Sequence, residues 1–107
     1  MAMIRRILVA YDGATGAKPE IKRSKQEAQK LAVELASKLK EPNADFGALA
    51  KKHSDAPDAA RGGILPAFKR DSDMDATLKS AAFQTAVGQF SGVINTDQGF
   101  LILQRLK

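Results

Sequence analysis

The sequence contains one tight turn between predicted strands, and the position of this turn constrains the fold more than any other feature. Two apolar-rich runs, Ser91 to Thr96 and Phe100 to Leu106, flank Asp97-Gln98-Gly99 near the end of the chain. Glycine supplies the positive φ angle that a short hairpin turn requires. The other two predicted strands, Ile4 to Ala10 and Ile64 to Phe68, are separated from the hairpin by helical patterns. An antiparallel sheet wrapped by helices is the natural packing for such an order.

Helical periodicity fills the segments between these strands. Ser24 and Glu27 form the pattern of a capping box, and apolar residues then recur at steps of three and four, which predicts a helix over residues 24–40. Asp45 is a suitable N-cap for a shorter second helix, and residues 74–83 carry a third apolar helical face. The sequence therefore predicts an α+β fold, a four-stranded antiparallel sheet surrounded by three to four helices.

Length and composition exclude several classes of protein. With 107 residues the chain is long enough for one domain and too short for two, so we expect a single domain over residues 1–107. It has no cysteine, which excludes disulfides, thiolate catalysis and cysteine-ligated zinc. No apolar run approaches the roughly 18 residues of a membrane-spanning helix, and residues 1–6 lack the apolar stretch of a secretory signal. If the chain is complete, we expect a cytoplasmic monomer.

The net charge of +5 does not by itself point to nucleic acid. Basic residues are spread along the chain and alternate with acidic ones, as in KRSKQE at residues 22–27, which is typical of a solvated helix face. The five phenylalanines and one tyrosine mostly occupy positions of the apolar pattern, which leaves no stacking platform for bases. We therefore expect neither nucleic acid nor a membrane among the partners.

The single histidine predicts no metal site. His53 has no second ligand at a suitable spacing, so we expect neither a metal nor another cofactor. Ser54 and Asp55 follow it directly, and sequence neighbours do not define the geometry of a catalytic triad. A local turn or cap is the expected role of these two residues.

Four segments together resemble one known family. They are RILVAYDGA, KRSKQEAQKLA, DFGALAKKHSDAPDAARGGILPAF and AAFQTAVGQFSGVINTDQGFLIL. In order and spacing, residues 4–106 are similar to parvulin-type peptidyl-prolyl cis/trans isomerases. The resemblance implies the parvulin fold and isomerisation of X-Pro bonds in unfolded or extended polypeptides.

The resemblance also implies an apolar pocket for the substrate proline. Leu65 takes the place of the leucine that faces this proline, after a double glycine that lets the chain turn beside the active site. Met74 matches a family methionine, Leu78 an aromatic residue and Phe83 a phenylalanine. Such a pocket would grip the proline ring and strip water from the twisted amide, which favours the transition state.

Several polar positions of the family are substituted. Arg6 and Leu101 stand where parvulins commonly have two histidines, and Ala56 replaces a cysteine or aspartate. Gln98 is the polar residue before the last glycine, and Thr96 matches the threonine before the same turn. We expect Arg6, Gln98 and Thr96 to carry catalysis, with Ala56 and Leu101 lining the substrate site.

The sequence leaves the place of Arg6 open. It is either an interior cation paired with Asp97 or Asp55, or a solvated residue on the outer side of its strand. The substituted positions also leave two functions open: a weak isomerase, in which Arg6, Gln98 or a backbone amide serves the polar atoms of the prolyl amide, or a noncatalytic peptide-binding or chaperone-like module.

Some parvulins prefer a phosphorylated residue before the proline. The loop after the first strand offers only Lys18 for this purpose, with Lys22 and Arg23 near the helix start. Bidentate phosphate recognition prefers paired arginines. We therefore expect no phosphate requirement.

Overall fold

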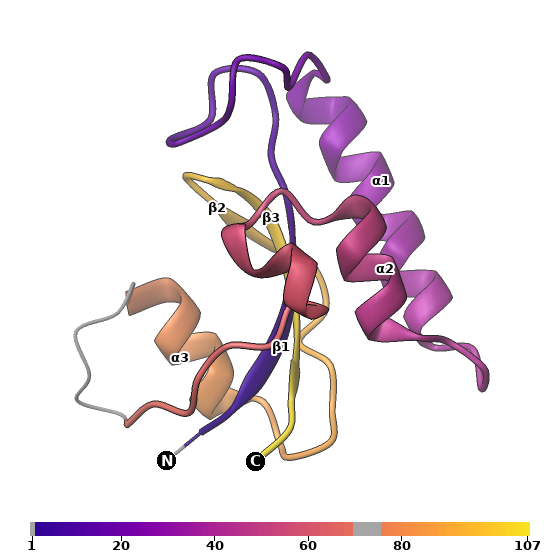
Figure 1. Ribbon diagram of the computed structural model, residues 1–107, viewed down its shortest axis with the longest axis vertical. Helices are drawn as coiled ribbons and strands as arrows, with labels where there is room; N and C mark the ends of the chain where they lie inside the picture. Colours follow the sequence, from indigo (N-terminus) through magenta and orange to yellow (C-terminus); the bar gives the residue numbers. More distant parts are fainter. Residues whose placement is uncertain (1, 70–75) are drawn as a thin grey trace.

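The computed structural model describes residues 2–69 and 76–107, and an antiparallel sheet lies at its centre (Figure 1). Each residue of β1 (Ile4–Val9) pairs with β3 (Gly99–Arg105), and β2 (Ile94–Thr96) pairs with the other edge of β3. The strand order is therefore β1-β3-β2. The predicted hairpin is confirmed as β2 and β3.

Helices cover both sides of this sheet. They are α1 (Lys25–Leu39), α2 (Phe46–His53), the 3₁₀-helix η1 (Pro57–Arg61) and α3 (Ala76–Gln84). Figure 1 shows α1 and α2 on one side of the sheet and α3 on the other. This arrangement confirms the α+β class. Within residues 2–69 and 76–107, no helix is long and apolar enough to cross a membrane.

Side chains cap the first two predicted helices as expected. The Ser24 hydroxyl accepts a hydrogen bond from the Glu27 N–H at 3.1 Å, and the Glu27 carboxylate accepts one from the Ser24 N–H at 2.9 Å. The Asp45 carboxylate accepts a hydrogen bond from the Ala48 N–H at 3.1 Å. These caps satisfy donors that have no partner inside the first helical turn.

Alternation along β1 gives the sheet two buried faces. Ile7 and Val9 pack into one core cluster with α1 and α2. Ile4 belongs to a second core cluster, which includes residues of α3. The sheet is therefore the middle layer between two separate apolar cores.

Arg6 lies on the face of the second cluster. Side chains alternate along a strand, so Arg6 and Leu8 share the face of Ile4. Their direct partners on β3 are Leu103 and Leu101, which are buried in this second cluster. The sheet face that packs on α3 therefore carries Arg6 beside buried leucines of β3 in the strand register.

The predicted fourth strand is not part of the sheet, and the expectation of four strands is wrong for the described residues. The segment 64–68 makes only isolated antiparallel bridges, Ile64 with Arg5 and Phe68 with Ala2. Pro66 lies between these bridges, and proline has no N–H to donate to a ladder. The segment therefore runs along the free edge of β1 without completing a strand.

Candidate active site

The centre of the site is an ion pair between Arg6 on β1 and Asp58 on η1. The Arg6 Nε lies 3.1 Å from one carboxylate oxygen of Asp58 and 3.3 Å from the other. The Asp58 side chain is 2% exposed and that of Arg6 is 20% exposed. The expectation that Arg6 pairs with Asp97 or Asp55, or faces solvent, is therefore wrong. Its partner is an aspartate that the sequence did not single out.

The double glycine holds this aspartate in place. Gly62 is the C-cap of η1 and adopts a left-handed conformation with φ of +73°. The next N–H, that of Gly63, donates to the carbonyl oxygen of Asp58 at 3.0 Å, and the carbonyl oxygen of Gly63 accepts from the Arg6 N–H at 2.9 Å. One glycine therefore connects the backbones of both partners of the ion pair.

The predicted apolar pocket residues lie together on the same sheet face. Leu65, Leu78, Phe83 and Leu101 all belong to the second core cluster. Leu78 and Leu101 are 5% and 3% exposed, whereas Leu65 and Phe83 are only partly buried. Met74, the fifth residue expected here, lies outside the described residues. Leu65 and Phe83 therefore lie at the exposed edge of this cluster, together with Ala81 and Ile94.

Thr96 and Gln98 occupy the β2–β3 turn. The Thr96 hydroxyl donates to the carbonyl oxygen of Gly99 at 2.8 Å and accepts from the Gln98 N–H at 3.2 Å. This hydroxyl is therefore engaged in the turn. The side chain of Gln98 is exposed and is not part of the apolar cluster.

Gln98 lines a small hollow beyond the end of β1. The hollow has a volume of about 210 Å³, and its lining is formed by Leu8, Ala10, Thr15, Gly16, Ala17, Lys18, Ile21, Asp55 and Gln98. Its carboxylate, that of Asp55, accepts hydrogen bonds from Arg23 Nη1 at 2.7 Å and from the Ala10 N–H at 2.9 Å. The negative charge in this hollow is therefore already paired with Arg23.

The Ser54 hydroxyl links the backbone of β1 to the backbone of Ala56, just before η1. The Ser54 hydroxyl accepts hydrogen bonds from the N–H groups of Leu8 at 3.1 Å and Ala56 at 3.3 Å. Ser54 is the C-cap of α2, in agreement with the expected role as a cap. Ala56 is 5% exposed and precedes η1, so its side chain brings no polar group to the site.

His53 is the last residue of α2. Burial lowers the pKa of His53, and the nearby charges of Lys52 and Lys38 lower it further. Among the described residues, no three His, Cys, Asp or Glu side chains are grouped so that they could hold a metal ion.

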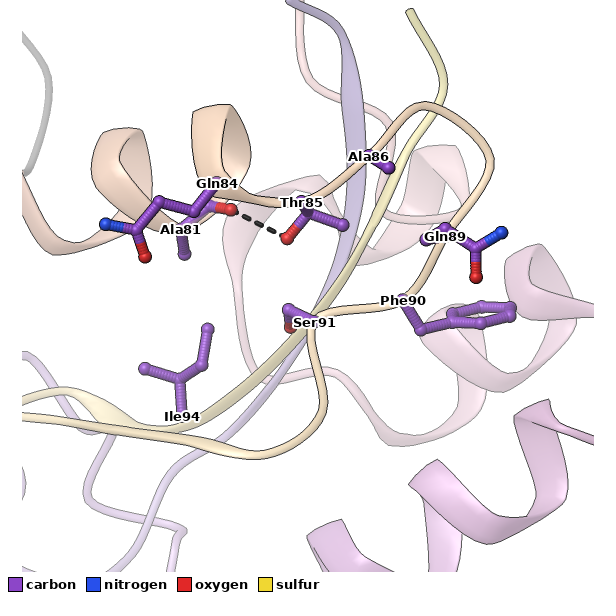
Figure 2. Close-up of a pocket in the computed structure, with 8 residues that line it drawn as sticks. All are labelled: Ala81, Gln84, Thr85, Ala86, Gln89, Phe90, Ser91 and Ile94. Atoms are coloured by element: carbon purple, nitrogen blue, oxygen red, sulfur yellow. Dashed lines mark hydrogen bonds between the residues drawn. The ribbon is translucent and has the colours of Figure 1, made fainter.

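A larger hollow, of about 390 Å³, lies beside the C-terminal end of α3 (Figure 2). Its lining contains no ionisable side chain and none of the predicted site residues; it consists of Ala81, Gln84, Thr85, Ala86, Gln89, Phe90, Ser91 and Ile94. The Thr85 hydroxyl within it donates to the carbonyl oxygen of Ala81 at 2.7 Å. This hollow therefore contains none of the residues that the sequence predicts for catalysis.

Comparisons with known proteins identify the family to which the chain belongs. Residues 7–107 match the family model described as Rotamase, the PPIC-type PPIASE domain. The peptidyl-prolyl cis-trans isomerase pin1 of Schizosaccharomyces pombe is 45% identical over 85 residues, which cover 79% of this chain and 48% of that protein. The foldase protein PrsA of Bacillus subtilis is 35% identical over 77 residues, which cover 72% of this chain and 26% of that protein.

A solved structure shares the fold along nearly the whole chain. The peptidyl-prolyl isomerase ESS1 from Candida albicans superposes with a TM-score of 0.90 at 26% identity, covering 99% of this chain and 62% of that one. The chain spans half or less of the length of the two curated relatives described above. The family match and the shared fold show that the chain belongs to the PPIC-type peptidyl-prolyl cis/trans isomerases, as the sequence resemblance implied.

Proposed function

We propose that this chain catalyses cis/trans isomerisation of X-Pro bonds in unfolded or extended polypeptides. The observation that carries the proposal is the guanidinium of Arg6 on the same sheet face as the apolar cluster of Leu65, Leu78, Phe83 and Leu101. An apolar surface favours the twisted prolyl amide, and a polar donor beside it would add stabilisation.

The apolar cluster lowers the barrier by desolvation. Rotation about the amide costs about 18–20 kcal/mol because resonance is lost in the twisted geometry. The twisted amide has less charge separation than the planar one, so an apolar site favours it over the ground state. Leu65 and Phe83, at the exposed edge of the cluster, would contact the proline ring.

Arg6 supplies the polar contribution. Asp58 occupies its Nε, and neither Nη atom donates a hydrogen bond to a described residue. These Nη groups would donate to the carbonyl oxygen or the pyramidal nitrogen of the twisted amide. A guanidinium stays charged at physiological pH, and a donor held in a poorly solvated site stabilises developing charge more strongly than water does.

Gln98 would contact the peptide next to the isomerised bond, and Thr96 would hold the turn from which Gln98 projects. The hollow beside Gln98 has both apolar and polar side chains in its lining, and Arg23 is already bound to Asp55 and to the carbonyl oxygen of Ala10. This leaves Lys18 as the basic side chain of the lining. We therefore propose that no phosphate is required before the proline.

A second candidate is a noncatalytic peptide-binding or chaperone-like module. Two substitutions favour it, because Ala56 and Leu101 bring no polar group to the site. The hydroxyl of the matching Thr96 is also engaged in a turn. In this case the apolar cluster would bind extended chains without turning them over.

A refolding assay separates the two candidates. The substrate is an unfolded protein whose slow refolding phase is limited by prolyl isomerisation, which takes about 10–100 s without a catalyst. An isomerase accelerates this phase at about one-twentieth of the substrate concentration, since it turns over. A binding module leaves the rate unchanged and suppresses aggregation only near equimolar amounts, and that result would refute the enzyme.

A further inference from the structure

We propose that Asp58 is a positioning residue for the isomerisation. It would hold the guanidinium of Arg6 by its Nε edge, so that the two Nη groups face the bound prolyl amide. This inference rests on the proposed function and assigns a role to a residue that itself touches no substrate.

The guanidinium of Arg6 is bound to Asp58 through its Nε atom alone. Both carboxylate oxygens of Asp58 accept hydrogen bonds from Nε, at 3.1 and 3.3 Å, and neither accepts one from an Nη atom. The Asp58 side chain is 2% exposed, whereas 20% of the Arg6 side chain remains accessible. One edge of the guanidinium is thus fixed in the interior, and no residue of the ranges 2–69 and 76–107 accepts a hydrogen bond from the other edge, which would face a ligand.

Backbone hydrogen bonds make this holding rigid. The Gly63 N–H donates to the Asp58 carbonyl oxygen at 3.0 Å, and the Gly63 carbonyl oxygen accepts from the Arg6 N–H at 2.9 Å. Together with the ion pair, these bonds close a ring through the backbones and side chains of both residues. A long arginine side chain is flexible in solution, so such a ring orients its donors before substrate arrives.

Charge also favours the arrangement. Arg6 faces Leu103 across the sheet, and Leu103 is fully buried. A guanidinium beside such a residue is costly unless a counter-ion is present. Asp58 supplies this counter-ion from the interior, and therefore no acidic group of the substrate is needed to neutralise Arg6.

A double-mutant cycle on kcat tests the proposal. Arg6→Lys keeps a cation opposite Asp58 but removes the second donor edge, and we expect kcat to fall about 30-fold with KM changed less than about twofold. Asp58→Asn keeps the volume but weakens the hold on Nε, with an expected fall in kcat of about tenfold. In the Arg6→Lys background, Asp58→Asn should change kcat less than about twofold, because the positioned edge is already absent.

Controls separate positioning from stability. Arg23→Gln removes the other ion pair of the described residues, at 2.7 Å, and should leave kcat within about twofold. If Asp58→Asn fails to fold, Asp58→Glu replaces it, because glutamate keeps the charge but displaces it. We expect Asp58→Glu to lower kcat to the same extent in the wild-type background. In the Arg6→Lys background, we expect it to have little effect on kcat. Urea unfolding of each variant confirms that the protein measured is folded.

The outcomes are distinct. If the Asp58 and Arg6 effects multiply independently, or if the Asp58 variants keep the wild-type kcat, the positioning role is refuted while the enzyme stands. If the wild-type chain itself does not isomerise X-Pro peptides, the proposed function fails, and the positioning role fails with it.

Discussion

Gly63 lies directly against the backbone of Arg6. The carbonyl oxygen of Gly63 accepts the Arg6 N–H at 2.9 Å, and a methyl group on Gly63 would collide with the carbonyl oxygen of Arg6. The residue also adopts φ of +81°, which L-amino acids rarely do. The double glycine therefore allows the polar segment before it to close on β1 at the position of the candidate catalytic arginine.

Gly63→Ala should be strongly destabilising. We expect the free energy of unfolding to fall by about 3 kcal/mol or more, because a strained φ is combined with a collision against rigid backbone. Gly88→Ala is the matched control, since Gly88 has φ of +86° but nothing within 4 Å of an added Cβ. It should cost about 1–2 kcal/mol, the strain alone. Urea unfolding measures both, and equal losses would contradict the close packing at Gly63.

Leu65→Ala should impair substrate turnover more than stability. Leu65 is partly exposed at the edge of the second core cluster, so we expect kcat/KM for X-Pro peptides to fall about tenfold. Leu49 is partly buried against the other cluster, and Leu49→Ala should lower the unfolding midpoint while keeping kcat/KM. If the two variants lose activity in parallel with stability, Leu65 has no specific role in substrate binding.

His53 should make stability depend on pH. Burial and the charges of Lys52 and Lys38 lower the pKa of His53 from 6.5 in the folded protein, so the unfolded state binds the proton more readily. This contribution is therefore fully present above pH 6.5 and is lost as the pH falls through the lowered folded value. Urea midpoints between about pH 7.5 and 5.5 should decline less in His53→Gln than in the wild type. Identical pH slopes would contradict the lowered pKa.

Phosphorylation before the proline should not improve binding. The guanidinium of Arg23 is bound to Asp55 at 2.7 Å and to the carbonyl oxygen of Ala10 at 2.9 Å, so it is not free to bind a phosphate. We expect a phosphorylated Ser-Pro peptide and its unmodified twin to bind within about threefold of one another in a fluorescence titration. An affinity about tenfold higher for the phosphorylated peptide would overturn this prediction.

Local features of the fold could be predicted from the sequence. The capping box of Ser24 and Glu27, the N-cap Asp45 and the hairpin turn before Gly99 each involve residues within a few positions of one another. Their geometry depends on short-range hydrogen bonds, which the residue types themselves indicate. The capping and the turn were therefore confirmed.

Two features could not be predicted, because they depend on distant contacts. Apolar residues 64–68 have the pattern of a strand, but Pro66 interrupts the pairing and leaves only two bridges with the first residues of the chain. Arg6 had several aspartates within reach of a compact fold, and only the 3₁₀ turn before the double glycine brings Asp58 to it. The sequence shows which charged residues exist, but only the folded backbone determines which aspartate pairs with Arg6.

The most direct test of the enzyme is NMR exchange spectroscopy on Ala-Xaa-Pro peptides, with Xaa varied over Lys, Arg, Glu, Leu and Phe. With the wild-type chain at substoichiometric concentration, cis/trans exchange cross-peaks should appear that are absent from the peptide alone and that fade in Leu65→Ala. If the peptide signals shift on binding but no exchange is gained for any Xaa, the chain is a parvulin fold that binds peptides without isomerising them.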